Sequence, residues 1–215
     1  MFAAVCRVQW KASFTAVVLL AVAGFIVPLL AVQRAGFSVG DRRGWDLVNM
    51  LSSVESTGTL FPVLAIIVGL ALAVSAWSAD HQGDHVYALT LPVPRWYYVL
   101  LRFGAGALLI VPVTVAVGLG CALALGSVDL PASLRTYAVA VTLRFTLAAL
   151  VGYALMFALA AGTRRTAGVV LLGVAVILAL AEVLATAGFG VLVDVLVGRL
   201  GPFEIFAGPW TLIGV

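Results

Sequence analysis

The sequence predicts an all-α integral membrane protein with about five to six transmembrane helices. Of its 215 residues, 64% are hydrophobic and only 10% are charged, whereas an ordinary soluble domain is about 45–50% apolar and about 25% charged. The apolar residues also form long continuous runs, without the alternation typical of barrel strands. In lipid, such runs satisfy their own backbone hydrogen bonds only as helices.

Five apolar runs are long enough for a helix to cross a hydrocarbon layer of about 30 Å, which takes about 20 residues. The runs are Ala12–Val32, Leu60–Trp77, Phe103–Leu125, Tyr137–Ala161 and Ala167–Ala187. Together they make residues 12–187 a block of five spans within a single transmembrane domain covering residues 1–215.

The two ends of the chain differ from this block. Residues 1–11 place Arg7, Gln9 and Lys11 among apolar side chains, a pattern typical of an interfacial helix with Trp10 at headgroup depth. Residues 188–215 contain only short apolar runs, cut by charges and prolines, which favours re-entrant or interfacial helices. Since another apolar run begins at the C-terminus, we expect a sixth span after residue 215.

The basic residues favour a cytoplasmic N-terminus in a multi-pass protein of the cell membrane. The short segment "GTRRT" carries Arg164 and Arg165 between two predicted spans, and short basic loops tend to stay in the cytoplasm. The net charge of +3 is small. A nucleic-acid-binding protein would show clustered basic patches instead, so we expect no nucleic acid partner.

The longest polar interruption is "DHQGDHVYALTLPVPRWYYVLLR", residues 80–102, which this topology places in the cytoplasm. It is a solvated loop, a metal site or a docking surface. A metal site would use the histidines and aspartates at residues 80–85, but the chain has no further histidine to complete a zinc set. A docking surface suits the apolar stretch "VYALTLPVP", because Pro92 and Pro94 fix a defined turn.

This stretch resembles the permease subunits of ABC-2 type ABC transporters. The family pattern runs from an acidic residue through glycine, threonine and two leucines to proline and a basic or polar residue. Asp80, Gly83, Leu89, Pro92 and Arg95 match that pattern, and Asp84 stands where threonine is common. The resemblance extends over essentially the whole chain, through its interfacial N-terminal helix, short loops and broken helices near the C-terminus.

The resemblance implies that this stretch is a coupling helix seated in a groove of a separate cytoplasmic ATP-binding subunit. That subunit would bind ATP and magnesium, and a second permease subunit would complete a homo- or heterodimer in the lipid bilayer. The residues to which the resemblance gives this coupling role are Asp80, Gly83, Asp84, Tyr87, Leu89, Pro92 and Arg95. The chain itself has no G-x-x-x-x-G-K-[ST] phosphate loop. We therefore expect it to be no enzyme, with no catalytic residue, metal or cofactor of its own.

Two charges interrupt the predicted spans, Arg144 in the fourth and Glu182 in the fifth. A charge in hydrocarbon costs at least about 2.5–3.5 kcal/mol, so such residues pair with one another or face a cavity. Arg144 and Glu182 fall at similar predicted depths. They are therefore either an ion pair joining two helices or part of a polar substrate path.

Two other classes of function fit an apolar helical bundle. A non-transporting membrane scaffold or accessory subunit of a larger complex is the main alternative to an exporter. A secondary transporter would need acidic residues at mid-membrane and broken helices in paired halves. The chain shows no such repeat, and Glu182 lies away from the centre of its span.

Overall fold

The computed structural model describes four long helical segments and parts of the C-terminal region. The described residues are 2–34, 57–82, 94–128, 134–161, 168–169, 172–173, 175–176, 179–180, 183, 204–207 and 210–214. The helices are α1 (Phe2–Arg34), α3 (Leu60–Gln82), α5 (Arg95–Leu108), α6 (Ile110–Gly126), α7 (Ala138–Ala161) and the short α10 (Glu204–Ala207). Two short strands are also present, β1 (Arg135–Thr136) and β2 (Ile213–Gly214).

Four helical segments within the described residues are long and apolar enough to cross a membrane. They are Phe2–Gln33, Leu60–Trp77, Trp96–Gly126 and Ala138–Ala161. They correspond to the first four predicted spans. The fifth predicted span falls mostly outside the described residues.

The N-terminal helix differs from the prediction, because α1 runs without interruption from Phe2 to Arg34. Residues 1–11 were expected to form a helix separate from the first span. No glycine or proline lies between residues 2 and 23, so nothing in the sequence ends the helix at Lys11. Pro28 is tolerated inside the same helix.

The third span begins earlier than its apolar run suggests and is divided into α5 and α6. Pro94 precedes α5, and its carbonyl accepts hydrogen bonds from the backbone nitrogens of Tyr97 (3.0 Å) and Tyr98 (3.2 Å). The division falls at Leu109, one turn before Pro112. Proline has no N–H for the carbonyl four residues earlier and its ring clashes with that carbonyl, which explains the break.

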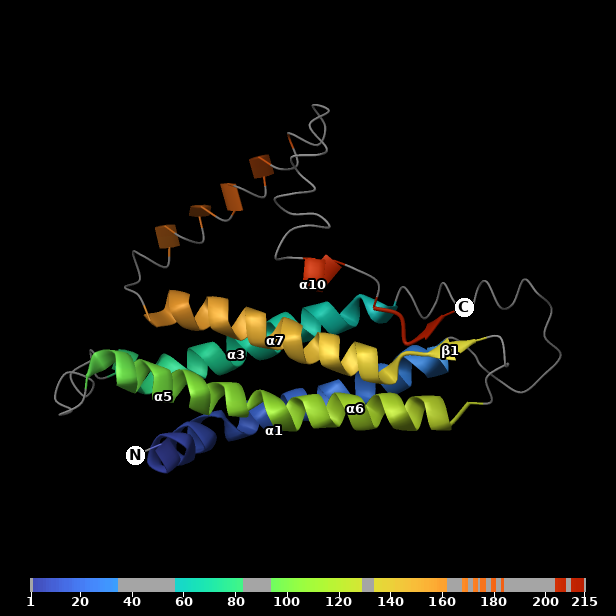
Figure 1. Cartoon of the computed structure of the whole chain (residues 1–215), viewed down its shortest axis with the longest axis horizontal. Coiled ribbons are helices and arrows are strands. Elements are labelled where there is room, and N and C mark those ends of the chain that lie inside the picture. The colour runs from blue at the N-terminus through green and yellow to red at the C-terminus, as the bar shows by residue number, and fades with distance from the viewer. Residues whose placement is uncertain are drawn as a thin grey trace.

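The helices pack as two parallel pairs that form one bundle (Figure 1). α1 packs along α6, and α3 packs along α7. Glycines allow the backbones to approach closely. A Cβ at Gly69 would lie 2.6 Å from the backbone nitrogen of Tyr153, and Gly120 faces the Phe25 carbonyl in the same way. Small residues at such contacts are typical of helix pairs in membranes.

The bundle has an apolar interior and an equally apolar exterior. Val68, Leu72, Val113 and Phe145 are completely buried. Large aliphatic side chains such as Leu19, at 65% exposed, cover the outside of every membrane-length helix. A soluble protein rarely exposes apolar patches of that extent, so this outer surface fits a hydrocarbon environment.

The two ends of the bundle are built differently. The N-terminal end, as we call it, holds the start of α1, the end of α3, the start of α5 and the end of α7 (Figure 1). The opposite end holds the strands: β1 pairs antiparallel with β2, with Arg135 opposite Gly214 and Thr136 opposite Ile213. The prediction of helices alone is therefore corrected at Ile213–Gly214, which form a strand because they pair with Arg135–Thr136 before α7.

Candidate functional site

Arg102 lies inside the bundle near its N-terminal end and is only 8% exposed. Its guanidinium carbon lies 5.3 Å from the ring centres of both Trp77 and Tyr98. Tyr98 precedes Arg102 by one helical turn on α5, and Trp77 comes from α3. A desolvated cation–π contact of this kind contributes about 2 kcal/mol, so the two rings compensate part of the cost of burying the charge.

A group of polar side chains lies at the same end of the bundle, and every long helical segment contributes to it. We call Gln9, Ser13, Ser75, Arg102 and Tyr153 the polar cluster. The Ser13 hydroxyl donates to the Ser75 hydroxyl at 2.7 Å, joining α1 to α3. The Tyr153 hydroxyl donates to the carbonyl of Phe103 at 3.2 Å, joining α7 to α5.

The polar cluster closes around Gly106 of α5. A Cβ at this position would collide with the Tyr153 hydroxyl and would lie 2.7 Å from the amide nitrogen of Gln9. Gln9 is only 5% exposed, and its amide faces Tyr153 without reaching hydrogen-bond geometry with any described group. Glycine is therefore required here to let α1 and α7 reach the same point on α5.

Aromatic rings seal the polar cluster from the side of α7. Phe103, Tyr153 and Phe157 lie with ring centres 5.3–5.5 Å apart, and Trp77 lies 5.1 Å from Phe157. Contacts of this kind stabilise by about 0.5–1.5 kcal/mol beyond the area that they bury. The cluster is thus a closely packed junction of four helical segments. It lies near the N-terminal end of the bundle, where α3 ends and α5 starts.

Arg144 lies near the opposite end of the bundle and is only partly buried. Its Nε donates to the carbonyl of Ile205 at 3.1 Å, and its guanidinium carbon lies 4.8 Å from the ring centre of Trp210. Both partners belong to the C-terminal segment, by which we mean the described residues 204–207 and 210–214. The arginine in the fourth span therefore fastens a segment some sixty residues further along the chain.

Trp210 is the centre of that attachment. Its ring stacks on Phe61 of α3 at 6.2 Å and 10°, and its indole nitrogen donates to the Phe206 carbonyl at 3.1 Å. Gly58 leaves room for the Trp210 backbone, because a Cβ there would lie 2.5 Å from its carbonyl oxygen. The C-terminal segment thus covers the starts of α3 and α7.

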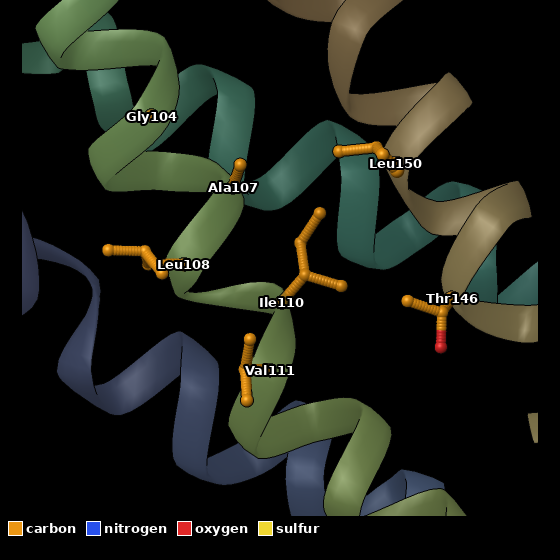
Figure 2. Close-up of a pocket in the computed structure, with 7 residues that line it drawn as sticks. All are labelled: Gly104, Ala107, Leu108, Ile110, Val111, Thr146 and Leu150. Carbon is orange, nitrogen blue, oxygen red and sulfur yellow. The ribbon is translucent and has the colours of Figure 1, made fainter. Parts of the chain in front are cut away.

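A shallow apolar hollow of about 250 Å³ lies beside the break between α5 and α6 (Figure 2). Its walls are formed by Gly104, Ala107, Leu108, Ile110, Val111, Thr146 and Leu150. The Thr146 hydroxyl donates to the Thr142 carbonyl at 2.8 Å, which leaves an almost wholly apolar surface. The hollow has no group for chemistry on a polar substrate.

The structure describes only part of the predicted coupling stretch. Asp80 is in the last turn of α3 and Arg95 in the first turn of α5, both at the N-terminal end of the bundle. The other five predicted coupling residues lie outside the described residues; they are Gly83, Asp84, Tyr87, Leu89 and Pro92. Glu182 also lies outside the described residues. The predicted pairing of Arg144 with Glu182 stays a prediction, while Ile205 and Trp210 are the partners that the structure describes.

Sequence reasoning missed Arg102 by treating it as a cytoplasmic charge outside the third span. The spacing of residues around Arg102 nevertheless indicates that it lies on a buried helix face. Tyr98, Arg102, Ala105 and Leu109 are spaced by four, three and four residues, and all four are buried. Extending the helical period upstream from Phe103 places Arg102 on the inward face.

Comparison with known proteins identifies no relative of this chain. No protein-family model, no curated protein and no solved structure matches the chain.

Proposed function

We propose that the chain is the membrane-spanning permease subunit of an ABC-2 type exporter. It would couple ATP hydrolysis by a separate cytoplasmic ATP-binding subunit to the movement of a substrate across the membrane. ATP and magnesium would be held by that partner, and a second permease subunit would complete the transporter.

The observation that supports this proposal most is the position of the polar cluster. The stretch that resembles a coupling helix connects the end of α3 to the start of α5, at the N-terminal end of the bundle (Figure 1). Arg102 follows Arg95 by about 10 Å along the helix axis. Arg102 contacts α3 through Trp77, and the cluster continues to α1 and α7.

Such a junction suits the transmission of force. A push on the stretch between α3 and α5 would act on two helices that are locked to each other and to their neighbours by buried polar and aromatic contacts. Packed interiors move as discrete units and do not deform continuously. The helices would therefore shift together when an ATP-binding subunit moves the stretch.

Co-purification from native membranes tests the proposal. The wild type is compared with a Leu89→Asp/Arg95→Glu double variant, and Arg135→Glu serves as the control, since it reverses an exposed charge at the other end of the bundle. The readouts are vanadate-sensitive ATPase activity and identification by mass spectrometry of a subunit that carries a phosphate loop. We expect the wild type and the control to retain both, and the double variant to lose about ten-fold or more of the partner.

The same experiment distinguishes the main alternative. If other membrane proteins co-purify with the wild type and no ATPase activity accompanies them, the exporter proposal is wrong and a scaffold or accessory subunit is the better description.

A further inference from the structure

We propose that one face of α1 binds the headgroup of an anionic phospholipid. The face consists of Arg7, Trp10, Lys11 and Phe14, which we call the basic–aromatic face. This inference does not depend on the proposed transport function, because it concerns the contact of the bundle with the bilayer.

The four side chains share a single face of the helix. Their spacing of three, one and three residues places them within two turns on the same side. All four are exposed, with Trp10 at 41% and Phe14 at 50%. The two rings meet edge to face at 5.7 Å, so the same side of the helix carries two adjacent aromatic rings and two cations.

The rotation of α1 that exposes this face is fixed by the interior of the bundle. Gln9 and Ser13 alternate in sequence with the exposed residues and are 5% and 0% exposed. Ser13 is bonded to Ser75. Because the side of the helix that carries Gln9 and Ser13 is buried in the bundle, the basic–aromatic face points away from the protein.

The depth of the face matches the headgroup region. The 33 residues of α1 span about 50 Å, against about 30 Å of hydrocarbon. The ring of Phe2 lies beside Gly104, and the amide of Gln9 lies beside Gly106. These contacts place the first turns of α1 beside α5, and the excess length of α1, about 20 Å, lets those turns extend beyond the hydrocarbon into the headgroup region.

The charge of the face selects the ligand. The first 34 residues contain no aspartate or glutamate, so no acidic side chain on α1 itself offsets Arg7 or Lys11. Basic side chains near a membrane surface attract anionic lipids, by about five-fold per residue. Arg7 suits a phosphate because its guanidinium donates two parallel hydrogen bonds, and Trp10 anchors at the depth of the headgroups.

Spin-labelled lipids provide the test. The full-length protein is reconstituted in phosphatidylcholine bilayers, and electron spin resonance measures the fraction of labelled phosphatidylglycerol, or of labelled phosphatidylcholine, that is immobilised at the protein surface. The variants are Arg7→Gln/Lys11→Gln, the charge-conserving Arg7→Lys/Lys11→Arg, and Arg135→Gln as a control for an exposed cation at the other end.

We expect the wild type to prefer phosphatidylglycerol by about two-fold or more averaged over the first lipid shell, with the preference reduced in 0.5 M salt. The Gln variant should lose most of this preference, while the charge-conserving variant and Arg135→Gln keep it. An unchanged preference in the Gln variant overturns the proposal. So does an equal loss in Arg135→Gln, or a wild type that does not distinguish the two lipids.

Discussion

Arg102 and Arg144 show two ways in which one protein places a guanidinium group inside a membrane-length helix. Both lie near an end of the bundle, and both contact aromatic rings at about 5 Å. Arg102 is covered by its own helix and its neighbours. Arg144 is covered by a segment distant in sequence, residues 204–207 and 210–214, that lies against the starts of α3 and α7.

Because different parts of the protein bury the two arginines, we expect their surroundings to unfold with different cooperativity. The surroundings of Arg102 are the helix contacts themselves, so disturbing them disturbs the whole bundle. The surroundings of Arg144 include a short helix, a two-residue strand and one tryptophan. Trp210, Leu212 and Ile213 of this segment are buried, but we expect a segment built from so few elements to open at a lower free energy than the helices of the bundle. The following four substitutions test this distinction.

The largest effect is expected for Arg102→Ala, which removes both cation–π contacts and leaves a cavity among buried aromatic rings. We expect the bundle to lose about 3 kcal/mol of stability in detergent, measured as a lower midpoint of thermal unfolding. Arg102→Met retains the volume of the side chain without its charge, and should lose less. Unfolding of Arg102→Ala at the wild-type temperature would contradict the central role of this junction.

Arg144→Gln should act locally. Loss of the bond to Ile205 and of the contact with Trp210 should weaken the attachment of the C-terminal segment by about 1–2 kcal/mol. Hydrogen exchange should accelerate in residues 204–214 and stay unchanged around Arg102. Gly58→Ala should give the same pattern, because its methyl group displaces the Trp210 backbone. Equal acceleration throughout α3 and α7 would show that the segment is part of the cooperative core.

Tyr153→Phe removes only the hydroxyl that donates to the Phe103 carbonyl. We expect a loss of about 1 kcal/mol, typical of one buried hydrogen bond, and a small decrease in the thermal midpoint. Tyr137→Phe is the matched control at the other end, where the side chain is 37% exposed. If both variants unfold at the same temperature as the wild type, the Tyr153 hydroxyl adds nothing to the junction.

Ser13→Ala should have the smallest effect. Hydrogen bonds between membrane helices contribute about 0.6 kcal/mol on average, and Ser75 keeps its bond to the Leu72 carbonyl at 2.8 Å. Ser127→Ala, at an exposed helix end, provides the reference for loss of a serine hydroxyl. A decrease for Ser13→Ala of several kcal/mol would indicate that the polar cluster is more cooperative than its separate bonds suggest.

Much of the fold follows from local features of the sequence. The apolar runs predict the four membrane-length segments, because length and composition alone decide whether a helix can cross hydrocarbon. Pro94 and Pro112 explain where α5 begins and where the third span breaks, since proline acts on its own backbone neighbourhood. The unbroken α1 is also local in origin, although an interfacial helix at residues 1–11 was expected as a separate element.

The candidate site could not be predicted from the sequence in the same way, because none of its residues stands out from its neighbours in the chain. Arg102 follows a polar stretch and resembles a loop charge until the start of α5 is fixed at Arg95. Trp77 resembles an interfacial anchor at the end of a span, and nothing local relates it to Tyr98. The strand pairing of residues 213–214 with 135–136 has no signal in a two-residue sequence.

The sequence by itself therefore determined the apolar character of this protein, its four described membrane-length segments and the prolines at which the third segment starts and breaks. These depend on transfer free energies and backbone restrictions, which act over a few residues. Only the tertiary structure decided that Arg102 lies between two rings and that Arg144 holds residues 204–214. Those contacts join positions up to 66 residues apart, as for Arg144 and Trp210. Their geometry exists only once Gly58, Gly69, Gly106 and Gly120 have brought the backbones together.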